Sequence, residues 1–187
     1  MMRWIITHIF KWLGWQVTGD LPPGISKGVL VIAPHTSNWD FFYGMSAIYI
    51  KRIPTRFAIK KEIMFFPLGS ILKWMGAISI DRTQKSNTHK KSNQVHMMTE
   101  ILDKSEKLIL IIAPEGTRKY APRWKTGFYH IALGAKVPII LGYLDYTKKE
   151  AGIGPIIYPT GDIEKDMEQI QNFYKDKIGK YPHQGVR

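Results

Sequence analysis

Short runs of consecutive apolar residues alternate along this chain with segments whose apolar residues follow the helical period. Runs of this kind are typical of strands covered on both faces, and they predict strands at 29–33, 56–59, 77–80, 108–112, 137–144 and 155–158. Helical patterns occupy 39–50, 92–104 and the segment after Asp162, a residue that can cap a helix. The alternation predicts an α/β fold, a single domain with a mixed, mostly parallel central sheet flanked by helices.

The pattern at the N-terminus differs from the rest. Residues 1–18 are expected to form an amphipathic, membrane-associating helix, in which Trp4, Trp12 and Trp15 suit the headgroup boundary of a bilayer. The alternative is a helix that packs on the domain core. In both cases the apolar stretch of the N-terminal segment is interrupted by His8 and Lys11 and is too short to span a bilayer. A signal-peptide cleavage site does not follow it. Residues 19–187 then form the globular domain.

A second segment, residues 64–76, is unusually apolar and carries Lys73 as its single charge. A helix with such a composition is either part of the core or faces a membrane. The pattern leaves both possibilities open.

The net charge of the chain indicates which classes of binding partner to expect. The chain of 187 residues has 27 Lys and Arg against 15 Asp and Glu, a formal net charge of +12, and residues 1–144 carry all of this excess. Such a surplus favours phosphate-rich or acidic partners: nucleic acid, anionic lipid headgroups or an acidic carrier protein. A non-catalytic basic module that binds anionic lipid or nucleic acid is therefore one hypothesis. Cysteine is absent, which excludes disulfides, thiolate metal sites and a thiol nucleophile.

The first candidate for chemistry is the stretch from His35 to Asp40, directly after a predicted buried strand. Ligands usually bind where the loops leave the carboxyl ends of strands in open α/β sheets. If Thr36 to Trp39 form a turn, Asp40 can accept the proton of one imidazole nitrogen, and the other nitrogen is free to take a proton from a hydroxyl. Taken alone, this spacing also fits a structural histidine.

The second candidate, Pro114–Arg118, follows the strand predicted at 108–112. Gly116 permits a tight turn, Thr117 can donate to an oxyanion, and Arg118 offers a planar fork that suits a phosphate. The alternative is a polar turn with Arg118 in solvent. Loops that bind nucleotide phosphates, a Gly-x-Ser-x-Gly elbow and a His-Glu-x-x-His zinc pair are absent from the sequence. A base without an evident nucleophile indicates direct attack by the hydroxyl of the substrate.

Four blocks of the sequence, in this order, are similar to the signatures of the glycerophospholipid acyltransferases: His35–Asp40, Gly76–Arg82, Pro114–Arg118 and Val137–Ile139. The similarity covers residues 29–144, and Pro34 and Ala113 depart from the usual residues of the family. The resemblance implies an enzyme that moves a fatty acyl group from a thioester to a hydroxyl of a lysophospholipid such as 1-acyl-sn-glycerol-3-phosphate.

Carried onto this sequence, the resemblance implies that His35 is the general base and Asp40 the carboxylate that orients it. It also implies a site for the phosphate of the acceptor, formed by Lys60, Lys61, Arg82, Glu115, Gly116, Thr117 and Arg118. Backbone N–H groups at the start of the helix after His35 are expected to hold the thioester oxyanion.

The same resemblance implies the partners and the location. The acyl donor is expected to be acyl-CoA or acyl-carrier protein, as a co-substrate, with no cofactor and no metal. A membrane lysophospholipid is the expected acceptor, and nucleic acid is not an expected partner. We expect a peripheral protein at the cytoplasmic face of the cell membrane, without a transmembrane span. The acceptor, the acyl length and the oligomeric state are left open.

Overall fold

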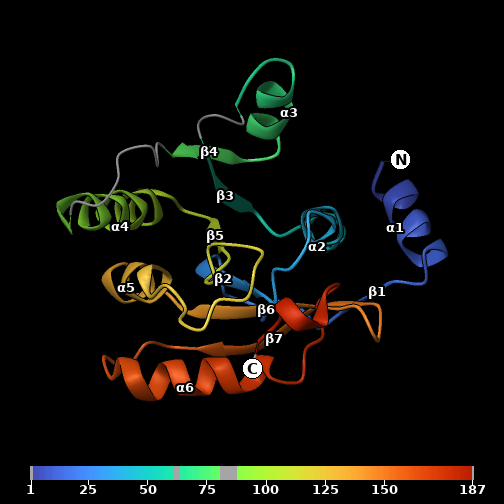
Figure 1. Ribbon diagram of the computed structural model, residues 1–187. Helices are drawn as coiled ribbons and strands as arrows, with labels where there is room; N and C mark the ends of the chain where they lie inside the picture. Colours follow the sequence, from blue (N-terminus) through green and yellow to red (C-terminus); the bar gives the residue numbers. More distant parts are fainter. Residues whose placement is uncertain (1, 61–63, 81–87, 187) are drawn as a thin grey trace.

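A computed structural model describes residues 2–60, 64–80 and 88–186 of the chain (Figure 1). The elements follow in the order α1 (Met2–Trp12), β1 (Gln16–Thr18), β2 (Lys27–Ala33), α2 (Trp39–Lys51), β3 (Thr55–Lys60), α3 (Leu68–Trp74), β4 (Ala77–Ile80), α4 (Thr88–Lys104), β5 (Leu108–Ile112), α5 (Gly127–Gly134), β6 (Ile139–Asp145), β7 (Glu150–Ile157) and α6 (Ile163–Tyr174), with a short 3₁₀ turn at Pro182–Gln184.

The strands form one seven-stranded sheet in the order β1-β7-β6-β2-β5-β3-β4. The strands from β6 to β4 run parallel to one another, whereas β7 is antiparallel to β6 and carries β1 parallel to itself. The predicted α/β fold with a mixed, mostly parallel sheet is confirmed. Because β2, β5 and β6 are parallel neighbours, the loops that follow them leave the same edge of the sheet.

Alternate residues of the central strand β2 point to opposite faces of the sheet and enter two different cores. Val29 and Val31 pack with residues of α4, α5 and α6 on one face, whereas Leu30 packs with Ile48 of α2 on the other. The three residues of β2 are at most 3% exposed. Figure 1 shows the resulting layers, with α4, α5 and α6 on one side of the sheet and α2 and α1 on the other. These fully buried strands explain why the sequence shows unbroken apolar runs.

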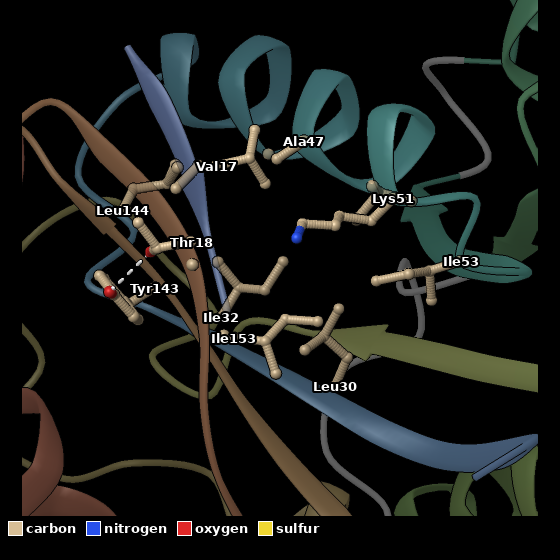
Figure 2. Close-up of a pocket in the computed structure, with 15 residues that line it drawn as sticks. Val17, Thr18, Leu30, Ile32, Ala47, Lys51, Ile53, Tyr143, Leu144 and Ile153 are labelled. Carbon is tan, nitrogen blue, oxygen red and sulfur yellow. Dashed lines mark hydrogen bonds between the residues drawn. The ribbon is translucent and has the colours of Figure 1, made fainter. Parts of the chain in front are cut away.

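A small apolar cavity remains between α2 and the sheet (Figure 2). It measures about 30 Å³ and is lined by Leu30, Ile32 and Ile153 among others, and the Lys51 side chain extends beside it from α2. In Figure 2 the Lys51 amine points in among the lining residues, and it pairs with the exposed Asp20 at 2.6 Å. A cavity of this size holds about one water, so it has no room for a substrate.

The N-terminal segment divides into a helix and a strand. Helix α1 ends at Trp12, and residues 16–18 form β1, which pairs with β7. The helix packs on α2 through Phe10, which joins Trp15 and Tyr43 in a small core. The expectation that Trp15 lies at the headgroup boundary is therefore wrong, because Trp15 is buried. The outward residues of α1 are apolar as well, and those exposed by more than a third are Met2, Trp4, Ile5, Ile9 and Trp12. Within the described residues, the helices are all too short or too polar to cross a bilayer.

Other elements differ in their bounds from the sequence predictions. Helix α4 begins at Thr88 rather than at residue 92. Helix α6 begins directly after Asp162, as predicted, and Asp162 caps it by accepting from the Lys165 N–H at 3.2 Å. The segment 64–76 contains the short helix α3, in which Leu72 is buried while Ile71 is exposed. It therefore faces both the core and the solvent.

Candidate active site

Two loops meet at the carboxyl edge of the sheet. One follows β2 and leads through His35 into α2, and the other follows β5 and contains Glu115. The register of the two strands places Val31 opposite Ile112, so both loops leave the sheet side by side. The Glu115 side chain bonds directly to the backbone of His35. The two stretches singled out in the sequence are thus brought together by the parallel pairing of their strands.

His35 and Asp40 are in contact, as their spacing suggested. The Nδ1 of His35 lies 3.1 Å from Oδ2 of Asp40, and the imidazole side chain is 29% exposed whereas that of Asp40 is 2% exposed. Because an ionised carboxylate only accepts hydrogen bonds, Nδ1 carries the proton and Nε2 is left as the acceptor. This arrangement leaves a basic nitrogen open to a ligand.

The turn between these two residues explains how the contact forms. The N–H groups of Thr36 and Ser37 donate to Oδ2 of Asp40 at 2.7 and 2.8 Å, which folds the loop back onto the first turn of α2. The Trp39 N–H donates to Oγ of Ser37 at 3.2 Å. These three N–H groups are therefore engaged within the loop, and a thioester oxyanion would need donors other than these.

Tyr146 contacts the second oxygen of Asp40. This residue was not predicted from the sequence. Its hydroxyl donates to Oδ1 of Asp40 at 2.7 Å. Burial, followed by the hydrogen bond to Asp40, raises the pKa of Tyr146 well above its ordinary value, so the phenol remains a proton donor. The one sequence signal is its position directly after the β6 strand, which matches the positions of His35 and Glu115 after their strands.

Glu115 is almost fully buried beside His35. The residue is 7% exposed, and Oε1 accepts a hydrogen bond from the His35 N–H at 3.0 Å. Its other oxygen, Oε2, is buried and has no partner among the described residues. Desolvation by burial raises the pKa of Glu115, although hydrogen bonds from its own backbone and from His35 oppose this effect. The observed contact ties the Glu115 loop to the His35 loop.

The residues after Glu115 are exposed at the surface. Gly116 adopts a φ of 63°, in the left-handed region, and Thr117 accepts from the Lys119 N–H at 3.3 Å. The side chain of Lys125 passes over Gly116 so closely that any Cβ at this position would overlap with it. Lys125 thus brings an ammonium group to the same loop as Arg118, although it was not among the predicted binding residues.

The remaining predicted binding residues are only partly covered by the structure. Lys60 ends β3, whose carboxyl end lies at the same edge of the sheet as that of β5. Lys61 and Arg82 lie outside the described residues, and so does the side chain of Lys60. Their participation in a phosphate site stays a prediction.

The matches to known proteins cover both loops. The acyltransferase family profile matches residues 15–141. Proteins named 1-acyl-sn-glycerol-3-phosphate acyltransferase align with the chain: that of Escherichia coli K12 is 31% identical over 117 residues, and that of Limnanthes douglasii 33% over 119. The Haemophilus influenzae protein of the same name is 28% identical over 145 residues.

These alignments include 59%, 61% and 74% of this chain, but 44%, 40% and 57% of the relatives. The chain therefore spans about half the length of the curated relatives that it matches. The family match contains His35, Asp40 and the whole Glu115 loop, whereas Tyr146 lies beyond it. Since this match extends over more than half of the chain and includes both loops of the site, the protein belongs to the acyltransferase family.

Proposed function

We propose that the protein is an O-acyltransferase that moves a fatty acyl group from a thioester to a hydroxyl of a lysophospholipid such as 1-acyl-sn-glycerol-3-phosphate. The observation that carries this proposal is the contact between His35 and Asp40, which leaves Nε2 of a half-buried imidazole open beside the Glu115 loop. The names of the relatives support the choice of acceptor. The alternative function, a non-catalytic basic module, does not explain why His35 and Asp40 are held in contact beside the Glu115 loop.

In the proposed reaction, the acceptor hydroxyl oxygen attacks the carbonyl carbon of the thioester while its proton moves to Nε2 of His35. Asp40 accepts from Nδ1, holds the ring in the required tautomer and stabilises the imidazolium that forms. The carbon–sulfur bond then breaks, and the leaving thiolate takes the proton from His35. The products are the new oxygen ester and the free thiol of coenzyme A or of the carrier protein.

The acceptor phosphate is assigned to the exposed loop at Gly116–Arg118, with Lys125 as an additional cation. The guanidinium of Arg118 can bind two phosphate oxygens at once, and Thr117 and backbone N–H groups can donate to the others. Lys60, Lys61 and Arg82 remain expected contributors. The bond from the His35 N–H to Glu115 ties this loop to the His35 loop.

A groove of about 810 Å³ between α1 and α2 is large and apolar enough for a fatty acyl chain. It is lined by Phe41 and Phe42, which follow Asp40 directly in the first turns of α2, and by Arg3 and Arg52. Ile6 of α1 forms part of the opposite wall. A chain in this groove would begin near the catalytic pair and run toward α1.

The location that we propose is the cytoplasmic face of the cell membrane, with peripheral attachment. Helix α1 exposes Trp4 and Trp12 by 65% and 84%, and the turn before α3 exposes Phe66 by 85%. Met75, directly after α3, and Met2 of α1 line the same groove, so the start of α1 and the end of α3 border one opening. Arg3 and Lys11 add positive charge that suits anionic headgroups.

The decisive experiment incubates the purified protein with a mixture of lysolipids and with acyl-CoA or acyl-carrier protein, followed by mass spectrometry of the lipids. We expect a diacyl phospholipid to form with release of the thiol. The His35→Ala variant is expected to lose this activity by several orders of magnitude while it unfolds at a similar temperature. Wild-type turnover by a folded His35→Ala variant would refute the proposed base.

A further inference from the structure

The two oxygens of the Asp40 carboxylate have unequal surroundings. Oδ2 accepts three hydrogen bonds, from the imidazole of His35 and from two backbone N–H groups of the loop. Among the residues that the structure describes, the donor to Oδ1 is the hydroxyl of Tyr146. Asp40 is 3% exposed, so water has little access to replace that donor.

We propose that Tyr146 is a positioning residue for acyl transfer, which fixes the plane of the Asp40 carboxylate and through it the orientation of the His35 ring. The inference rests on the proposed function of these two residues. Rotation about the Cβ–Cγ bond of Asp40 moves both carboxylate oxygens together, and terminal torsions of this type have broad energy wells. The short bond from Tyr146 to Oδ1 narrows the range of this torsion, and it thereby helps the bonds at Oδ2 to keep that oxygen directed at Nδ1 of His35.

Tyr146 itself is held rigidly from two sides. Its ring meets the Trp15 ring edge-on, at 4.9 Å between centroids and an angle of 89°, and meets Tyr43 at 5.9 Å. Trp15 stacks on Tyr43 at 4.1 Å, so the three rings form one block. The Tyr146 N–H donates to the carbonyl of Ile178 at 2.8 Å. The hydroxyl therefore reaches Asp40 from a side chain with little freedom to move.

The segment that holds the Tyr146 backbone also holds the loop of His35. The Tyr181 N–H donates to Oγ1 of Thr36 at 3.3 Å. Gly179 packs so closely that a Cβ there would lie 2.7 Å from Cγ2 of Thr36. Residues 178–181 thus fix Tyr146 and the His35 loop relative to each other. They lie beyond the part of the chain that matches the family.

The test compares Tyr146→Phe with Tyr143→Phe in the full-length protein. Tyr143 is a matched control because it also belongs to this end of β6 and donates through its hydroxyl to Glu150, away from the catalytic loop. We expect Tyr146→Phe to lower kcat about tenfold with KM nearly unchanged, since the lost bond was made to a charged group. Tyr143→Phe is expected to keep the wild-type kcat. Equal values of kcat for both variants would overturn the inference.

A double-mutant cycle distinguishes positioning from a general loss of structure. If Tyr146 acts through Asp40, adding Tyr146→Phe to Asp40→Asn should change kcat less than twofold, because there is no longer a carboxylate to orient. If the two losses multiply, Tyr146 acts by another route and the inference fails. Tyr143→Phe in the same background serves as the reference for an independent site.

Thermal unfolding covers the case in which loss of the hydroxyl impairs folding. Tyr146→Phe keeps the ring that packs on Trp15 and Tyr43, so we expect it to be folded at the assay temperature, and kcat is taken per folded molecule. A wild-type kcat per folded molecule would contradict the inference. An inactive His35→Ala together with an unaffected Tyr146→Phe would refute this inference alone, whereas an active His35→Ala would refute the catalytic role on which it rests.

Discussion

Oε1 of Glu115 accepts a hydrogen bond from the backbone N–H of His35 at 3.0 Å, across 80 positions of the sequence. A side chain of one loop of the candidate site thereby fixes the main chain of the other. The bond places the start of the His35 loop at a defined distance from the loop that carries Arg118. Glu115 therefore connects the proposed base with the proposed phosphate site, and it does so from a buried position.

This contact predicts different effects for two substitutions of Glu115. Glu115→Gln keeps an acceptor oxygen for the His35 N–H, so we expect it to retain most of the activity. Glu115→Ala leaves a buried N–H without a partner, which costs about 1–3 kcal/mol and releases the loop, and we expect activity to fall at least tenfold. Steady-state kinetics of acyl transfer checks both. Equally low activity of the two variants would show that the negative charge or the proton of Glu115 is needed instead.

The raised pKa of Glu115 predicts a pH dependence of stability. Burial makes the folded protein bind this proton more tightly than the unfolded chain does, so the contribution is fully present below the ordinary value of 4.5 and is lost as the pH rises through the raised value. Glu115→Gln does not titrate. The free energy of unfolding of wild type minus that of Glu115→Gln should therefore decrease from acid toward neutral pH. Urea unfolding at a series of pH values measures this difference, and a constant or increasing difference would contradict it.

Arg118 and Lys125 predict a preference for acceptors that carry phosphate. Because both side chains are exposed, each should contribute a modest charge-assisted contact, and we expect Arg118→Ala to raise the KM for 1-acyl-glycerol-3-phosphate about tenfold. Activity toward a monoacylglycerol should not change. Lys107→Ala is the matched control, since Lys107 is exposed at the opposite end of β5. An equal loss toward both acceptors would exclude Arg118 as a phosphate contact.

The buried strands could be predicted from the sequence because both faces of the sheet are covered, which makes residues such as 29–33 and 108–112 continuously apolar. Helix α5 was missed because its eight residues are too few for a helical period to show. The strand β1 was missed for a different reason. It has three residues, and its partner Glu150 lies more than 130 positions away.

The contact of His35 with Asp40 could be predicted because both residues lie in one turn, and local geometry decides whether they meet. The contacts of Tyr146 and Lys125 could not. Both contacts join segments that are distant in the sequence. Tyr146 reaches Asp40 because β6 lies beside β2. Lys125 reaches Gly116 because its N–H donates to the Pro114 carbonyl at 2.9 Å. The position of Tyr146 directly after a strand marks it as a candidate, but its contact with Asp40 cannot be predicted from a single sequence.

The exposed aromatic residues of α1 and of the turn before α3 predict which surface meets the bilayer. Transfer of a tryptophan or phenylalanine side chain into lipid stabilises binding by roughly 1.5–3 kcal/mol, so Trp12→Ser and Phe66→Ser should each weaken binding to anionic vesicles about tenfold. Tyr158→Ser is the control. Tyr158 is 64% exposed, but it follows the end of β7 that lies away from β1, the strand that comes after α1. Co-sedimentation with vesicles of phosphatidylglycerol and phosphatidylcholine measures the binding. If the Tyr158 variant bound as weakly as the other two, exposed hydrophobic residues in general would account for the binding to vesicles, rather than the surface of α1 and the turn before α3.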